Sequence, residues 1–238
     1  MFWRFSLLTV LIVGGLSACH QETDTTPATQ LIASYKALGA ACETVCSYDD
    51  QSRLVKAMVC DSAELYSYFN DSIVMQYTVS GVERYRYTYL FDAAKKYVSG
   101  YVRRDAFSTS TYRYQYDANG FRTALTLDGD TATYRHYQIS DGNVVEEVAQ
   151  YTANPSGNAT ITASYYANTR NLLGNDNYGR PFLGTSSKNL KQGETWVTPD
   201  GTFFILYKYE IDDQSRVHKR VKILNAVDTM EVRYFVYR

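Results

Sequence analysis

The chain has 238 residues, with 24 Lys and Arg against 25 Asp and Glu, and a formal net charge of −1. This balance excludes the basic excess that draws proteins to nucleic acid, and it excludes a strongly acidic, disordered domain. Hydrophobic residues make up 45% of the chain and 23 residues are tyrosine, so the chain can build a full core.

Residues 1–18 have the pattern of a secretory signal peptide. Arg4 precedes an apolar run from Phe5 to Leu16 that is too short to span a bilayer, and small residues follow. The stretch Leu16-Ser17-Ala18-Cys19 resembles the bacterial lipobox, whose cysteine is acylated, for example with palmitate, and becomes the first mature residue. This resemblance implies lipid on Cys19 and membrane attachment without a spanning segment. The alternative is an ordinary signal peptide with an incidental cysteine.

Residues 20–30 read HQETDTTPATQ and are almost free of large apolar side chains. We therefore interpret residues 19–30 as the lipidated cysteine and a flexible tether. The remaining residues, 31–238, are enough for a single all-β domain with its own core.

The pentapeptide Asp-Asp-Gln-Ser-Arg occurs twice, at residues 49–53 and 212–216, each time between strand-forming segments. Aspartate favours tight turns because its side chain bonds to the nearby backbone, and serine can do the same. The repeat therefore predicts two hairpins. The segments 111–127 and 133–148, and more loosely 65–79, combine alternating aromatic residues with an Asp or Asn turn in the same way.

Further turn signals at residues 128–130, 154–158, 199–201 and 225–228 extend this pattern to the carboxyl end. Typical strand and loop lengths then give about 12 to 15 strands. We expect an all-β fold, an antiparallel up-and-down meander that forms a closed barrel or a strongly curved single sheet. Residues 31–42 fit either a helix or a first strand.

Tyrosines alternate with charged residues along the predicted strands. Tyr85, Tyr87, Tyr89 and Phe91 lie on one face of residues 82–91, opposite Arg84 and Arg86, and residues 111–117 repeat the pattern. Cross-strand aromatic pairs stabilise sheets, so the tyrosine face is interpreted first as structural.

The turn patterns Tyr48-Asp49-Asp50-Gln51-Ser52-Arg53 and Tyr116-Asp117-Ala118-Asn119-Gly120-Phe121-Arg122 resemble tyrosine-aspartate repeats of bacterial surface proteins. Together with the lipobox, the tether and the segment 183–190, they resemble a family of Bacteroidota lipoproteins of unknown function. That resemblance implies a porin-like β fold. The chain departs from the pattern where Ser52 and Ser215 replace the turn glycine, and in its extra cysteines.

A porin-like fold raises the question of whether the strands cross a membrane. A lipid-facing surface needs an apolar band, whereas the adjacent Glu146 and Glu147 put one carboxylate on each face of their strand. Glu83 is predicted on the tyrosine side of its own strand. We therefore expect a water-exposed barrel or sheet, whose interior could hold a ligand, water or an inserted loop if more than about ten strands close.

With Cys19 assigned to lipid, Cys42, Cys46 and Cys60 remain in an oxidising compartment. A hairpin turn at residues 49–53 sets Tyr48 opposite Leu54, Cys46 opposite Lys56 and Cys42 opposite Cys60. Cys42 and Cys46 would be roughly 13 Å apart along one strand, beyond disulfide reach. This register predicts a Cys42–Cys60 bridge. Free thiols, or a pairing that involves Cys46, remain open.

No motif in the sequence identifies a chemistry, and we expect no cofactor. The three histidines are not spaced as metal ligands, and nucleophile-elbow, phosphate-loop and dinucleotide motifs are absent. Ser186 and Ser187 beside Lys188 lack the spacing of a Ser/Lys pair. No residue is therefore assigned as catalytic or as a metal ligand.

The long irregular stretch 171–196 is the first place to look for a ligand site, because long connections in compact domains are often functional. Exposed aromatic rings could stack on sugars there, and the candidates are Tyr178, Arg180, Phe182 and Trp196. The competing interpretation is that Phe182 and Trp196 close one end of the core.

Secreted proteins of the resembled lineage carry O-glycans at Asp-Ser or Asp-Thr followed by a small or aliphatic residue. The matching positions are Thr25, Ser62, Ser72, Thr131 and Thr229. The same dipeptides are also ordinary turn formers.

Three hypotheses for function follow from the sequence. The first is a lipid-anchored, non-catalytic protein of the outer membrane, on its periplasmic or cell-surface side, that binds a glycan, a peptide or an envelope protein. The second is a glycan-active enzyme with carboxylates brought together by the fold. The third is a structural scaffold.

Overall fold

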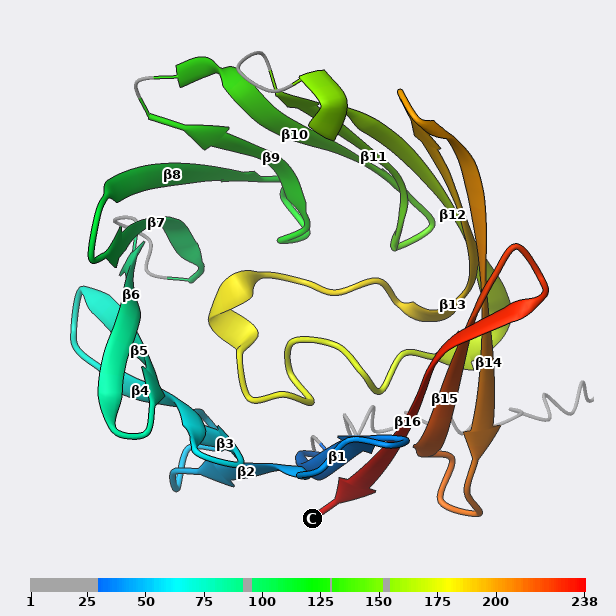
Figure 1. Ribbon diagram of the computed structural model, residues 1–238, viewed down its shortest axis with the longest axis horizontal. Helices are drawn as coiled ribbons and strands as arrows, with labels where there is room; N and C mark the ends of the chain where they lie inside the picture. The colour runs from blue at the N-terminus through cyan, green and yellow to red at the C-terminus, as the bar shows by residue number, and fades with distance from the viewer. Residues whose placement is uncertain (1–29, 92–95, 129, 152–154) are drawn as a thin grey trace, which may run out of the picture.

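A computed structural model describes residues 30–91, 96–128, 130–151 and 155–238, which form a closed β-barrel (Figure 1). Its sixteen strands are β1 (Ile32–Ala37), β2 (Thr44–Tyr48), β3 (Leu54–Val59), β4 (Ser62–Tyr68), β5 (Ser72–Val79), β6 (Val82–Phe91), β7 (Val98–Asp105), β8 (Thr109–Tyr116), β9 (Arg122–Leu127), β10 (Asp130–Ser140), β11 (Asn143–Tyr151), β12 (Ala159–Arg170), β13 (Asn189–Thr198), β14 (Gly201–Ile211), β15 (Val217–Leu224) and β16 (Asp228–Tyr237). Two short 3-10 helices, η1 (Pro155–Gly157) and η2 (Pro181–Leu183), interrupt the loops.

Each strand pairs with its neighbour in the chain, and β1 pairs antiparallel with β16, with Tyr35 opposite Phe235, to close the barrel.

The predicted all-β antiparallel meander is confirmed. The expected number of strands was too low because β2, β3 and β4 have only 5, 6 and 7 residues. The first segment of the domain is strand β1, and the helical alternative for it was wrong. No helix within the described ranges is long and apolar enough to cross a membrane.

The two copies of the pentapeptide form the same turn. Asp49 Oδ1 accepts the backbone N–H of Gln51 and Arg53, and Asp212 accepts those of Gln214 and Arg216 in the same way. In each copy the arginine Nε donates to the second carboxylate oxygen of the aspartate, at 2.7 and 2.8 Å. The side chain therefore supplies acceptors for turn N–H groups that the ladder leaves unpaired.

Asp117 makes the corresponding bonds to Asn119 and Phe121. In that turn Gly120 has φ of 82°, and in the pentapeptide turns Ser52 and Ser215 have φ of 62° and 61°. Serine thus adopts the left-handed conformation at the position where the resembled pattern has glycine.

The Asp and Asn hairpins that combine alternating aromatic residues with the pentapeptide-like turn lie at one end of the barrel, and the further turn signals at 128–130, 199–201 and 225–228 lie at the other. The hairpins of the first group connect β2 to β3, β4 to β5, β8 to β9, β10 to β11 and β14 to β15, and in an antiparallel meander such connections share one rim. We call their end the plug rim, because the connection from β12 to β13 also starts there, and the opposite end the far rim. Residues 171–188 of that connection, the plug, run across the inside of the barrel (Figure 1).

Backbone hydrogen bonds fix the plug to the turns of the plug rim. Leu54 and Ile32 donate their N–H to the carbonyls of Gly179 and Asn177, both at 2.9 Å. On the other side, the N–H groups of Thr185 and Lys188 donate to the carbonyls of Gly120 and Gly142, both at 2.8 Å. These bonds come from four separate places along the rim, so the plug is held as part of the fold.

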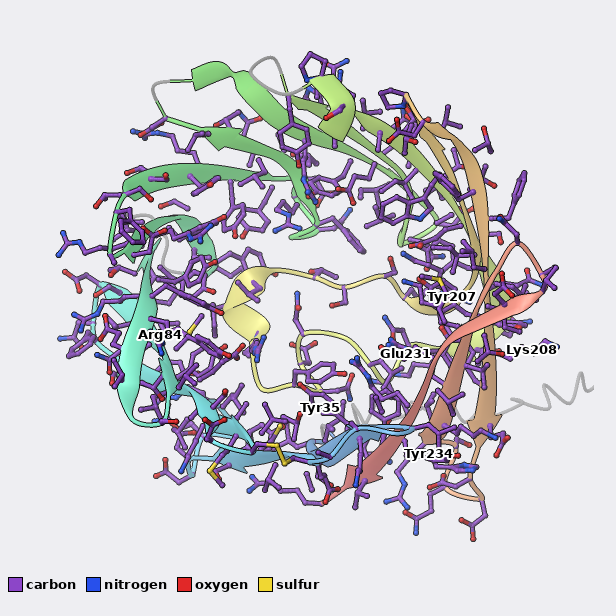
Figure 2. The ribbon with its side chains drawn as sticks, viewed as in Figure 1. Tyr35, Arg84, Tyr207, Lys208, Glu231 and Tyr234 are labelled. Atoms are coloured by element: carbon purple, nitrogen blue, oxygen red, sulfur yellow. A yellow bond between two sulfur atoms is a disulfide. The ribbon has the colours of Figure 1, made fainter. Side chains whose placement is uncertain are left out.

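Tyrosines and charged residues alternate between the inside and the outside of the barrel wall. Tyr207 and Glu231 point into the barrel, whereas Lys208 and Tyr234 point away from it (Figure 2). The plug packs against two hydrophobic clusters of the inner wall. Phe182 joins a buried cluster with Leu54, Ala57, Tyr66, Ile73, Met75 and Val98 of β3 to β7. Tyr178 and Leu173 pack against a second cluster of Ile32, Leu190, Val217 and Phe235.

A β-bulge reverses the predicted side of Glu83. The register shifts between Tyr77 and Thr78, so that Thr78 lies opposite Glu83 while Tyr77 lies opposite Tyr85. Glu83 therefore shares the outer face with Gln76 and Arg86 and accepts hydrogen bonds from both at 2.8 Å. The prediction that Glu83 lies on the tyrosine side was wrong because a bulge changes which residues share a face.

A second bulge, between Ser47 and Tyr48, changes the cysteine hairpin. Tyr48 does lie opposite Leu54, but Cys46 lies opposite Ala57, so its predicted pairing with Lys56 was wrong. Cys42 and Cys60 form a disulfide, with their Cα atoms 5.4 Å apart, just beyond the paired residues of this hairpin. Cys46 is a free, half-buried thiol, and burial raises its pKa.

We predict that removal of the bridge with the pair Cys42→Ala and Cys60→Ala lowers the free energy of unfolding by about 3 kcal/mol, because the open chain gains entropy when it unfolds. Urea denaturation measures the change. The control is Cys46→Ala, which keeps the bridge. Equal losses in the control and the double variant, or a bridged Cys46 peptide in a non-reduced digest, would contradict this pairing.

Replacing Gly179 with alanine should loosen the plug. Gly179 has φ of 66°, and a Cβ there would lie 2.6 Å from the Tyr48 ring and 2.8 Å from the Leu54 nitrogen. We expect a loss of about 2 to 5 kcal/mol, from backbone strain plus overpacking. Gly81→Ala is the matched control, since its φ is 77° and a Cβ would meet nothing within 4 Å. A loss no larger than in the control would show that the close contact is unimportant.

Candidate functional site

The plug divides the interior unevenly and leaves space along the arc of the wall that it does not contact. A cavity of about 440 Å³ lies between the plug and the inner faces of β9 to β15. Its wall side is lined by Arg122, Tyr137, Val144, Glu147, Tyr165, Lys191, Tyr207, Tyr209 and Arg220, and its plug side by Asn171, Leu173, Asn175, Leu183 and the residues 185–187. We call it the luminal cavity.

A second cavity of about 370 Å³ adjoins it along β7 to β11. It is lined by Tyr101, Tyr112, Tyr114, Leu125, Leu127, Arg135 and Tyr151, and it shares Arg122 and Tyr137 with the luminal cavity. Each volume lies in the range of small-molecule sites, about 300 to 1,000 Å³. Tyrosine rings with a few charged groups and amides therefore surround two neighbouring cavities that share two lining residues.

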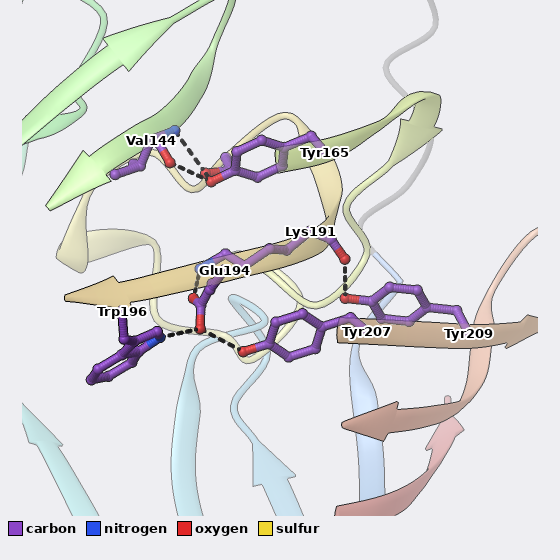
Figure 3. A network of polar contacts seen from close by, with 8 residues as sticks. Val144, Tyr165, Lys191, Glu194, Trp196, Tyr207 and Tyr209 are labelled. Carbon is purple, nitrogen blue, oxygen red and sulfur yellow. Dashed lines mark hydrogen bonds and ion pairs between the residues drawn. The ribbon is translucent and has the colours of Figure 1, made fainter. Parts of the chain in front are cut away.

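One polar network is built around Glu194, whose side chain is only 8% exposed (Figure 3). The carboxylate pairs with the Lys191 ammonium and accepts hydrogen bonds from Trp196 Nε1 and the Tyr207 hydroxyl, both at 3.0 Å. Burial alone would raise the pKa of Glu194, but the ion pair and the hydrogen bonds outweigh it and hold the pKa below its usual range.

The plug contributes hydroxyl and amide groups at the edge of the luminal cavity. The Tyr165 hydroxyl donates to the Val144 carbonyl at 2.5 Å and lies 3.1 Å from Ser187 Oγ of the plug (Figure 3). The Asn175 side chain donates to the Gly184 carbonyl, so the plug also braces itself. These contacts fix the positions of polar groups before any ligand arrives.

Charged side chains in the adjoining cavity are likewise bound to each other. Arg135 Nη1 donates to Glu147 at 2.8 Å, and Arg135 Nη2 donates to the Tyr151 hydroxyl at 2.7 Å. Burial opposes the charge on Arg135, yet these partners raise its pKa. Arg135 therefore stays cationic at every pH of interest.

The residues predicted as a ligand site do not gather in one place. Arg180 pairs with Glu64 at 2.7 Å and lies over the Tyr66 ring, and Phe182 packs against Tyr68 and Tyr89. Tyr178 packs edge-on against Tyr35, and burial raises its pKa to about 12. Trp196 lies on β13, away from the plug segment that holds the other three. Of the four, Phe182 lines a cavity, at the plug rim, and none lines the luminal cavity.

Three of the predicted glycosylation positions lie near hairpin ends in the described chain. Ser62 and Thr229 are near the far rim and Ser72 is near the plug rim. Thr131 belongs to β10, in a stretch whose side chains are not described, and Cys19 and Thr25 lie outside the described residues.

Sequence reasoning did not find the luminal cavity. Its wall residues come from seven strands, and the sequence marks each of them only as one more alternating tyrosine or charged residue. The one usable signal was the length of the 171–196 segment. That signal identified the plug but not the arc of wall that the plug leaves uncovered.

The geometry defines a class: a plugged antiparallel β-barrel with a polar, tyrosine-lined interior. Solved structures with this fold include a porin-like protein from Bacteroides uniformis, with 14% identity, a TM-score of 0.67, and coverage of 87% of this chain and 98% of that one. A porin-like protein from Bacteroides vulgatus has 12% identity and a TM-score of 0.59, with coverage of 88% and 99%. The sequence matches no protein-family model and no curated protein. The likeness confirms the porin-like β fold that the resemblance implied.

Glu194 should make stability depend on pH. Its folded pKa lies below the unfolded value of about 4.3, so its contribution is present above that value and is lost as pH falls through the folded pKa. We predict that Glu194→Gln costs about 2 kcal/mol at neutral pH and that its difference from the parent narrows below about pH 4. Chemical denaturation across pH measures both effects.

Glu210→Gln is the control for this experiment. Glu210 lies on the outer face, 53% exposed, beside Lys219 and His218. Replacing this exposed carboxylate should leave the free energy of unfolding near that of the parent protein. A Glu194→Gln deficit that stays constant down to acid pH would contradict the role given to this carboxylate.

Proposed function

We propose that the protein is a non-catalytic, lipid-anchored receptor of the cell envelope that holds a glycan in its luminal cavity. The observation that carries the proposal is the set of rings and amides that converge there. Tyr137, Tyr165 and Tyr207 present rings and hydroxyls on the wall, and Asn171 and Asn175 present amides on the plug. Sugar rings need both, because they stack on aromatic faces and exchange hydrogen bonds with polar groups.

The carboxylates of the interior favour binding over glycoside hydrolysis. A glycosidase needs a carboxylic acid with a raised pKa to protonate the leaving group. Glu194 has a lowered pKa and its oxygens are occupied by three partners. Glu147 is paired with Arg135. The groups nearest the cavity thus stabilise the wall.

The fixed plug favours a closed receptor over an open pore. To open the barrel, the plug would have to break backbone bonds to Leu54, Ile32, Gly120 and Gly142 and withdraw Phe182 from its buried cluster. A cavity remains between the plug and the wall, which opposes the third possibility, an inert scaffold with a filled interior.

The outer face supports a barrel that lies in water beside the membrane. Arg86 and Arg104 face each other on the outside of β6 and β7, Arg113 follows on β8, and Glu146 points outward from β11. Each arginine would cost about 2 to 4 kcal/mol at a bilayer midplane. Membrane association then rests on acylation of Cys19, with residues 19–30 as a tether that precedes β1.

Binding can be tested with the full-length chain, purified in detergent, on an array of neutral and acidic glycans. We predict that the chain binds a subset of them and that Tyr137→Ala weakens this binding about three- to tenfold, since one stacked ring is lost. The control Tyr234→Ala removes an outward tyrosine and should leave binding unchanged.

Two results of the array experiment would contradict the proposal. Absence of binding to every glycan, with the melting temperature of the chain intact, would overturn the proposed function. Equal weakening by Tyr137→Ala and Tyr234→Ala would place the binding surface outside the cavity.

A further inference from the structure

Most charged groups that point into the barrel have a partner of opposite charge. The pairs are Arg180 with Glu64, Arg135 with Glu147, Lys191 with Glu194, and Arg220 and Arg233 with the two oxygens of Glu231. Buried charges need such partners because desolvation is costly. A cation that faces the cavity without one therefore stands out.

Arg122 is such a cation. Its guanidinium lies between two tyrosine rings, 5.1 Å from the Tyr114 centroid and 4.9 Å from that of Tyr137. Arg122 takes part in none of the ion pairs found among the described residues, and its Nε is buried without a hydrogen-bond partner. Arg122 begins β9 and faces inward because it lies opposite Tyr116, next to the Asp117 turn.

The position of Arg122 relates it to both cavities. It lines the luminal cavity and the adjoining one, and so does Tyr137. Its guanidinium therefore lies where the two cavities adjoin. The two rings hold the guanidinium by cation–π contact, which leaves its positive charge without a neutralising carboxylate.

We infer that Arg122 binds the anionic group, a carboxylate or a sulfate ester, of an acidic sugar in the luminal cavity. The inference rests on the proposed function and names the class of glycan that the cavity takes. A guanidinium offers parallel N–H groups that match two oxygens of such a group, and the bond is stronger when both sides are charged. The site is preorganised because neighbouring rings already fix the side chain.

The test compares uronic-acid, sulfated and neutral glycans on the same array, with the full-length chain and its Arg122→Gln variant. Acidic glycans should bind at least tenfold better than neutral ones of the same linkage. Arg122→Gln should abolish that preference, because it should weaken the binding of acidic glycans at least tenfold more than the binding of neutral ones. Comparing the binding of uronic-acid and sulfated glycans shows whether the anionic group that Arg122 binds is a carboxylate or a sulfate ester. Arg104→Gln removes an equal charge from the outer face and is the matched control.

A second measurement does not depend on the variant. Raising the salt concentration from about 20 to about 500 mM should weaken the binding of acidic glycans by the parent chain and leave the binding of neutral glycans unchanged, since salt screens charge.

Equal binding of neutral and acidic glycans, unaffected by salt or by Arg122→Gln, would overturn this inference and leave the proposed function standing. Failure to bind any glycan would remove the proposed function itself. A loss in Arg104→Gln equal to that in Arg122→Gln would mean that net charge, and not this site, sets the preference.

Discussion

The closure of sixteen strands into one barrel is the constraint on which the rest of the structure depends. A barrel of about eight strands is filled by its own side chains, and one twice as large is not. Even with tyrosines on the inside, the wall leaves an interior that needs another element. The plug from β12 to β13 is that element, and its contacts with the wall determine where solvent-accessible space remains.

Three turns at the plug rim share one geometry that helps the plug to dock. An Asp turn satisfies its own N–H groups through the aspartate side chain, as Asp49, Asp117 and Asp212 do. Backbone groups beside these turns, such as the Leu54 N–H and the Gly120 carbonyl, are then free to bond to the plug. Gly179 and Gly184 allow the close approach, since a Cβ on either would lie 2.6 Å from a tyrosine ring. The first copy of the pentapeptide therefore has two roles: it reverses the chain, and it precedes the Leu54 N–H group that binds the plug.

The sequence could predict the elements that local chemistry specifies. Alternation of tyrosine with charge predicted strands, Asp-containing turns predicted antiparallel neighbours, and the length of the segment 171–196 predicted an irregular connection, without placing it inside the barrel. The strand register was harder to predict from the sequence. The bulges at Val55 and Arg84 depend on how neighbouring strands twist, and no residue type in the sequence indicates their positions. The cavity was inaccessible for a different reason. Arg122 and Tyr207 are 85 positions apart and meet only when the barrel closes with the plug on the opposite arc.

The uneven packing of the plug explains why the interior is apolar on one side and polar on the other. Phe182, Leu54, Ile73 and Val98 exclude water where the plug meets β3 to β7, and burial of such side chains contributes roughly 1.5 to 3 kcal/mol each. On the other arc, the tyrosine hydroxyls lie near arginine and glutamate side chains. The charged groups that form ion pairs there are neutralised by their partners. Because Arg122 lies next to the turn that accepts the plug residue Thr185, the same rim segment anchors the plug and presents the guanidinium. The position of that charge in the cavity is therefore set by the docking that creates the cavity.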